Sequence, residues 1–170
     1  IAGAVGVPRY AGIDSDAAWF SSTRSEVPSH FRFYLADIGA TKEWGYPEES
    51  LQKQILDYQL APMHVEQQPF DVYLVDGRWR IACALIAFLH ASARGARPAD
   101  TAVLLHDCVT KNVTSPYLYR SAYRAEYEIL NSLFIREKHS GEALCVYKRK
   151  PTTIDDDIYR LWEQEKARML

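Results

Sequence analysis

The fold is decided by one stretch of sequence, Pro69-Phe70-Asp71-Val72-Tyr73-Leu74-Val75-Asp76-Gly77-Arg78-Trp79-Arg80. An apolar run ends there in an acid and a glycine, and residues 81–90 follow without Gly or Pro. This order is typical of a buried parallel strand that leads into a helix packed against the sheet. Ligands bind outside the carboxyl ends of strands in open α/β sheets, so Asp76 marks the expected position of a site.

Composition favours one globular domain and excludes some functions. The 170 residues are 48% hydrophobic, enough for a sizeable core, and no segment resembles a linker, so a single domain over residues 1–170 is expected. Twenty Lys and Arg residues against 22 Asp and Glu give a net charge of −2, which argues against nucleic-acid binding. The apolar runs are shorter than the roughly 20 residues that cross a bilayer, so no membrane span is expected.

The cysteines give a prediction about oxidation state. Cys83, Cys108 and Cys145 lie in or beside apolar runs and show no CxxC or Cys/His ligand spacing. We therefore predict reduced core thiols and an intracellular protein.

Strand and helix patterns alternate through the first two thirds of the chain. Apolar runs predict strands over residues 9–13, 31–36, 70–75 and 101–105, and periodic segments predict helices over residues 17–25, 48–60 and 80–93. Each strand is followed by an acid, in order Asp14, Asp37, Asp76 and Asp107. The alternation predicts an α/β fold with a Rossmann-like, doubly wound, mostly parallel sheet.

The last third follows a different pattern. Strands are expected near residues 128–135 and 143–148, joined by a turn at 138–141 into a C-terminal antiparallel hairpin. Residues 153–170 begin with three acids and continue with spaced apolar residues, which predicts a terminal amphipathic helix.

A tyrosine-rich stretch precedes that hairpin. Its aromatic residues lie at spacings near those of a helix and are mixed with arginines, and such residues dominate contact energies at protein interfaces. We predict that this stretch contacts a protein partner or a larger complex through Tyr117, Tyr119, Arg120, Tyr123, Arg124 and Tyr127. Packing in the core is the alternative.

The chain resembles class I S-adenosylmethionine-dependent methyltransferases. The resemblance is carried by the order of the acidic turns, the VDG segment of residues 70–85, the strand end at His106-Asp107 and the final hairpin. The resemblance spans nearly the whole chain and implies S-adenosylmethionine as the cofactor. It implies that Asp14, with Asp16 as a substitute, holds the ribose hydroxyls, that Asp37 approaches the adenine, and that Asp76 lies near the methionine part or a metal.

The resemblance also shows two departures. Metal-dependent relatives carry an Asp-Asn pair where this chain has Asp107 and Cys108, so no metal site of that type is expected. The family's first strand and glycine-rich loop should precede Arg9, where the sequence offers only the eight residues 1–8. We therefore expect the central strand of the sheet to be absent from this chain. Either upstream sequence supplies it, or another chain or segment completes the sheet, or the fold has been rebuilt.

The site residues admit functional and structural interpretations. His106 beside Asp107 is a candidate pair for catalysis at neutral pH, with a purely structural role as the alternative. Each acid alone can serve as a cap or turn residue. Arg78 is expected to bridge to Asp76 or Asp107 and keep the crevice in shape, with binding of an anionic substrate as the alternative.

Two functions follow. The first is a methyltransferase-like pseudoenzyme that serves as a scaffold or accessory subunit, in an organelle or elsewhere in the cell. The alternative is an active S-adenosylmethionine-dependent methyltransferase that acts on a small acceptor. The sequence slightly favours the first, because the glycine-rich loop is missing.

Overall fold

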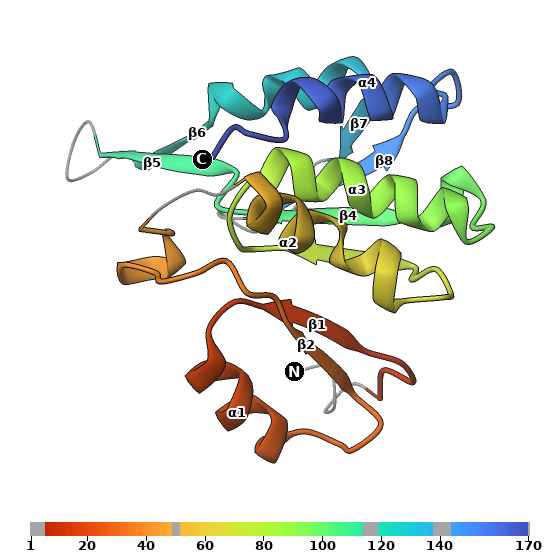
Figure 1. Cartoon of the computed structure of the whole chain (residues 1–170). Coiled ribbons are helices and arrows are strands. Elements are labelled where there is room, and N and C mark those ends of the chain that lie inside the picture. The colour runs from red at the N-terminus through yellow and green to blue at the C-terminus, as the bar shows by residue number, and fades with distance from the viewer. Residues whose placement is uncertain (1–5, 49–51, 114–118, 138–143, 170) are drawn as a thin grey trace. The chain divides into compact units, whose positions relative to one another are not determined.

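The computed structural model describes residues 6–48, 52–113, 119–137 and 144–169 (Figure 1). The chain divides into two compact units, residues 1–61 and residues 62–170. None of the described helices has the length and apolar character needed to span a membrane.

The N-terminal unit is built around two parallel strands. Its elements are, in chain order, β1 (Ala11–Asp14), α1 (Ala17–Glu26), β2 (Arg32–Leu35), the 3-10 helix η1 (Glu43–Gly45) and most of α2 (Gln52–Val65). The strands pair with Asp14 opposite Leu35. Helix α1 begins after Asp16, whose carboxylate accepts hydrogen bonds from the amides of Ala18 and Trp19.

Aromatic side chains hold this unit together. The ring of Tyr10 stacks on Phe31 with 5.0 Å between centroids, and Phe33 lies 5.5 Å from the same ring. Gly12 permits this packing, because a Cβ there would stand 3.0 Å from the Phe33 ring.

The C-terminal unit contains a four-stranded sheet in the order β3-β4-β8-β7. The strands are β3 (Val72–Val75), β4 (Ala102–His106), β7 (Phe134–Glu137) and β8 (Leu144–Arg149). β3 and β4 are parallel, whereas β8 is antiparallel to both β4 and β7. A separate antiparallel hairpin consists of β5 (Val109–Val113) and β6 (Tyr119–Tyr123).

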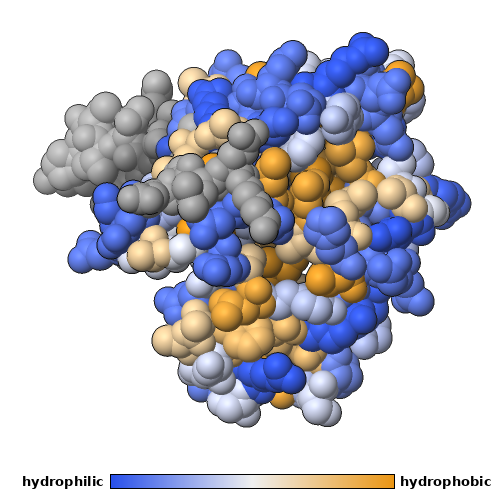
Figure 2. All heavy atoms as spheres, in the orientation of Figure 1, coloured by the Kyte–Doolittle hydropathy of each residue, from blue (hydrophilic) through white to orange (hydrophobic). Residues whose placement is uncertain are grey.

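Two long helices pack together in this unit, and Figure 1 shows α3 lying between β4 and α4. The helical elements are α3 (Arg80–Ala93), the 3-10 helices η2 (Pro98–Asp100) and η3 (Ala125–Ser132), and α4 (Asp155–Glu165). Fully buried Ile81 and Leu85 of α3 share the core with Leu105 of β4 and Ile158 of α4. In Figure 2 the surface along α4 is mostly hydrophilic, and hydrophobic residues are seen below it over α3.

Side chains alternate along β3 between covered and uncovered positions. Val75 is buried, whereas Val72 and Leu74 are 55% and 63% exposed. Alternate residues of a strand point to opposite faces, so one face of the sheet at β3 is apolar and open to solvent. Within the described residues, β3 pairs with β4 alone and β1 with β2 alone.

The structure confirms most of the expected elements and changes some details. All four early strands and the three helices are present, as are the terminal hairpin and the helix within residues 153–170. Within the four-stranded sheet β8 alone runs against the other three strands, as the predicted antiparallel hairpin in a mostly parallel sheet requires. Residues 128–132 belong to η3 rather than to a strand, and the predicted turn at 138–141 lies outside the described residues.

The prediction of three reduced thiols was wrong for two of them. Cys108 and Cys145 form a disulfide with 5.9 Å between their Cα atoms, and Cys83 is free. The pairing depends on tertiary structure: β4 and β8 are antiparallel neighbours with Leu105 opposite Cys145, and Cys108 follows soon after β4 ends. Spacing along the sequence carries no signal of this register.

Candidate functional site

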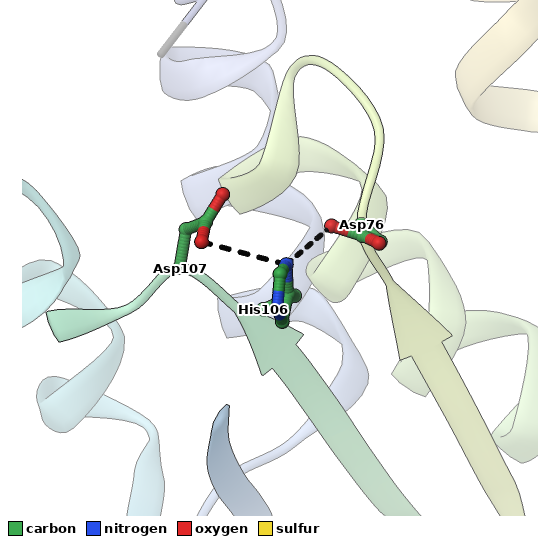
Figure 3. A group of neighbouring side chains, drawn as sticks. All are labelled: Asp76, His106 and Asp107. Atoms are coloured by element: carbon green, nitrogen blue, oxygen red, sulfur yellow. Dashed lines mark hydrogen bonds and ion pairs between the residues drawn. The ribbon is translucent and has the colours of Figure 1, made fainter. Parts of the chain in front are cut away.

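The candidate site lies at the carboxyl ends of β3 and β4. The two strands are parallel with Val75 opposite Leu105, so the residues that follow each pair meet at one edge of the sheet. Asp76 follows β3 directly, His106 ends β4, and Asp107 comes next. Figure 3 shows the His106 ring between the two carboxylates.

One short hydrogen bond organises the three side chains. His106 Nδ1 lies 2.7 Å from Asp76 Oδ1 and 3.5 Å from Asp107 Oδ1. An ionised carboxylate can only accept, so Nδ1 must carry the proton that it donates to Asp76. When the ring is neutral, Nε2 is then the unprotonated nitrogen and can accept a proton.

Arg80 lies behind this group at the first residue of α3. Its guanidinium donates from Nε to the Gly77 carbonyl at 3.0 Å, from one terminal nitrogen to the His106 carbonyl at 3.2 Å, and from the other to Asp107 Oδ2 at 3.1 Å. The last nitrogen also lies 3.8 Å from Asp76 Oδ1. One side chain therefore contacts both strand-end loops.

Arg80 keeps its positive charge although its side chain is only 7% exposed. Burial lowers the pKa of the guanidinium, but the Tyr127 hydroxyl and the Asp107 carboxylate outweigh that effect and hold the pKa above its ordinary value. The site thus combines a fixed cation with two acids.

The backbone is unusual at the same place. Trp79 and Asp107 have φ values of 49° and 53°, and they are the non-glycine residues with positive φ in the described part of the chain. Such conformations cost of order 1–3 kcal/mol each and persist only where the surroundings enforce them. Trp79, only 1% exposed, is held by the core, and Asp107 by Arg80.

The acids and the imidazole are open to solvent. The side chains of Asp76, Asp107 and His106 are 55%, 51% and 40% exposed. A ligand can therefore reach them, and the energy of their mutual contacts is reduced by solvent screening.

The same three residues could hold a metal ion. Asp76, His106 and Asp107 each offer one ligand atom, and these atoms lie within 4.8 Å of one another. Two carboxylates and an imidazole suit several divalent cations. To bind one, His106 Nδ1 would have to release its proton, and the cation would compete with Arg80 for Asp107.

His90 of α3 provides a contrast. It is fully buried, with Nε2 3.0 Å from the Glu66 carbonyl and Nδ1 2.7 Å from the Tyr73 hydroxyl. A carbonyl only accepts, so Nε2 carries the proton and Nδ1 accepts from Tyr73. His90 is a core residue with both nitrogens bonded, whereas His106 stands at the edge of the sheet.

Asp14 and Asp37, predicted to bind the cofactor, belong to the N-terminal unit. Asp14 is the last residue of β1, and Asp37 comes two residues after the end of β2, so both lie at the carboxyl ends of the paired strands, as predicted. Asp14 Oδ1 accepts from the Asp16 amide at 2.8 Å, and Asp37 Oδ1 accepts from the Gly39 amide at 2.9 Å. One oxygen of each carboxylate thus holds its own turn. Asp16 caps α1, which makes it the weaker candidate.

The bridge between the two acids that the structure establishes is made by Arg80, which was not singled out from the sequence. Arg80 lies 3.8 Å from Asp76 and 3.1 Å from Asp107. Arg78, the arginine expected to bridge these acids, donates to the Gly77 carbonyl at 3.4 Å, and its bridge stays a prediction. The sequence contains a signal for the pairing of Arg80 with Asp76, because the two residues are four positions apart at the start of a helix.

The predicted protein interface stays a prediction, with one correction. Tyr127 is fully buried and contributes to the core instead of the surface. The helix-like spacing of the stretch does not correspond to a helix there, because Tyr119, Arg120 and Tyr123 belong to strand β6. Tyr117 lies outside the described residues.

Comparison with known proteins supports the fold. The structure is similar to the crystal structure of a methyltransferase-like protein from Silicibacter pomeroyi, with a TM-score of 0.68 and 22% sequence identity. The match covers 93% of this chain and 76% of that chain. No family model matches the sequence, and no curated protein matches it. The likeness supports a Rossmann-like α/β fold.

Proposed function

We propose that this chain is part of an active S-adenosylmethionine-dependent methyltransferase that acts on a small acceptor. The observation that carries the proposal is the 2.7 Å contact between His106 Nδ1 and Asp76, because it leaves Nε2 of an exposed imidazole as a proton acceptor. A structural histidine would be expected to have both nitrogens engaged, as His90 does.

The residues of the N-terminal unit fit the nucleoside of the cofactor. Asp14 and Asp37 each use one carboxylate oxygen to hold a turn, and the second oxygen can accept a hydrogen bond from a hydroxyl or an amino group. When bound, S-adenosylmethionine supplies a methyl group activated by a positively charged sulfur.

The residues of the C-terminal unit would act on the acceptor. His106 Nε2 takes the proton that an acceptor hydroxyl or amine loses when it is methylated. Asp76 stabilises the resulting imidazolium through Nδ1, and Asp107, fixed by Arg80, contributes negative charge beside the ring. Methyl transfer depends mainly on alignment, so this proton transfer would add to a rate set by positioning.

Calorimetric titration of S-adenosylmethionine and S-adenosylhomocysteine into the purified chain tests the proposal. Micromolar binding that is lost in Asp14→Ala and retained in Asp100→Ala, a surface acid paired with Arg97, is the expected result. Absence of binding by a chain whose circular dichroism shows a folded protein would overturn it.

A second candidate is the non-catalytic scaffold or accessory subunit. It is favoured by the exposed apolar side chains of Val72 and Leu74, which another protein segment could cover. Hydrogen exchange separates the two candidates: if the amides of residues 72–75 exchange as fast in a cell extract as in the purified chain, no segment covers β3 and this support is removed.

A further inference from the structure

The site depends on a residue that would not touch an acceptor. Arg80 is 6% exposed, while the three side chains that it serves are open to solvent. We propose that Arg80 is the positioning residue of the site, which holds the end of β4 so that His106 Nδ1 stays on Asp76. This inference rests on the proposed function for its purpose, but its geometry can be tested without the cofactor.

The contacts of Arg80 divide into two sets. One nitrogen donates to the Gly77 carbonyl in the loop after β3, and the two others hold the His106 carbonyl and the Asp107 carboxylate after β4. A planar guanidinium with fixed donor directions sets the distance between the two loops, which a lysine ammonium cannot do.

The positive charge of Arg80 is a second reason to regard it as the positioning residue. The carboxylates of Asp76 and Asp107 both approach His106 Nδ1, and like charges at that separation repel. Arg80 lies 3.8 Å from the first and 3.1 Å from the second, so its cation compensates the repulsion and keeps Asp107 in its left-handed conformation.

The arginine is itself held firmly. It begins α3 directly after Trp79, whose indole is buried and whose backbone is left-handed, and its own side chain is 7% exposed. A side chain with few alternative conformations loses little entropy when it orders its partners.

The test is the tautomer of His106, read from the nitrogen chemical shifts of the imidazole in the full chain. The wild-type protein should show the Nδ1–H form for His106, with His90 as an internal reference in the Nε2–H form. Arg80→Met should lose the Nδ1–H form of His106 and leave His90 unchanged, because the β4 end relaxes away from Asp76.

Arg94→Met is the matched control. Arg94 follows the other end of α3 and also binds backbone carbonyls, those of Glu66 and Met63. It should lower stability without changing the tautomer of His106. An unchanged His106 tautomer in folded Arg80→Met would overturn the proposal and leave Arg80 a purely stabilising residue.

Arg80→Lys serves where Arg80→Met does not fold. Lysine keeps the charge but lacks the guanidinium fork, so a partial loss of the Nδ1–H form is expected, and no loss would again overturn the proposal. Failure of the wild-type chain to bind S-adenosylmethionine would overturn the proposed function instead, and the tautomer measurement would still decide the role of Arg80.

Discussion

Asp76 Oδ1 accepts a 2.7 Å hydrogen bond from His106 Nδ1, and this bond joins the ends of two neighbouring parallel strands through their side chains. The residues are 30 positions apart in the sequence, so only the pairing of β3 with β4 brings them together. The first prediction concerns this bond.

Replacing Asp76 by Ala should remove the Nδ1–H tautomer of His106, because Asp107 is held by Arg80 and lies 3.5 Å from the ring nitrogen. Nitrogen chemical shifts of the imidazole measure the change. Asp71→Ala, at the opposite end of β3, should leave the tautomer as it is. Persistence of the Nδ1–H form in Asp76→Ala would show that the bond does not set the tautomer.

Removal of metal ions should not weaken cofactor binding. A divalent cation at Asp76, His106 and Asp107 would have to displace the Nδ1 proton and lie beside the Arg80 guanidinium, which repels it. Titration of S-adenosylhomocysteine before and after dialysis against EDTA should give dissociation constants that agree within about twofold, a difference of about 0.4 kcal/mol. A large loss of affinity restored by Mn²⁺ or Zn²⁺ would instead identify a metal centre.

The disulfide should contribute substantially to stability. Cys108 and Cys145 are separated by 37 residues, and closing a loop of that length stabilises a fold by about 4 kcal/mol in the chain-entropy treatment. Urea unfolding of the oxidised protein and of the Cys108→Ala, Cys145→Ala double variant measures the difference. Cys83→Ala, which leaves the disulfide intact, is the control. Equal stability of oxidised protein and double variant would rule out this contribution.

The thiol of Cys83 should make stability fall at alkaline pH. Burial raises its pKa from 9.0 to about 12, although the residue as a whole keeps part of its surface exposed. The folded protein therefore keeps a proton that the unfolded chain loses, so the contribution is complete below about pH 9 and decreases as the pH rises toward 12. Urea unfolding at about pH 8 and about pH 10 should show a larger decrease for the wild-type chain than for Cys83→Ala.

Of the two aromatic residues of helix α4, Trp162 should contribute to the stability of the fold and Tyr159 should contribute little. Trp162 is 6% exposed and Tyr159 is 52% exposed. Trp162→Ala should lower the free energy of unfolding by about 3–5 kcal/mol, because it leaves a cavity against the core. Tyr159→Ala should change it by less than about 1 kcal/mol. Similar losses in both variants would contradict the observed packing of α4.

The sequence predicts the elements that carry strong local signals. Helix α3 is predicted within its observed bounds because residues 81–90 contain no breaker, and α4 because its acids precede spaced apolar residues. The strand ends at Asp14, Asp76 and Asp107 also carry a local signal, because an acid interrupts an apolar run at each of them, and they were located correctly.

Pairings between distant segments carry no local signal. The Cys108–Cys145 disulfide, the antiparallel position of β8 beside β4 and the burial of Tyr127 depend on tertiary contacts. The β5–β6 hairpin was missed because spaced tyrosines suit either a helix or a strand face. The role of Arg80 could not be predicted, because the prediction depends on knowing which residue begins α3.

The open edge of β3 has a practical consequence for the purified protein. A strand with exposed Val72 and Leu74 and one unpaired edge among the described strands presents backbone groups and apolar side chains that invite another strand. Concentrated samples of the isolated chain should therefore self-associate by pairing at β3. A charged residue in place of Leu74 should raise the solubility limit.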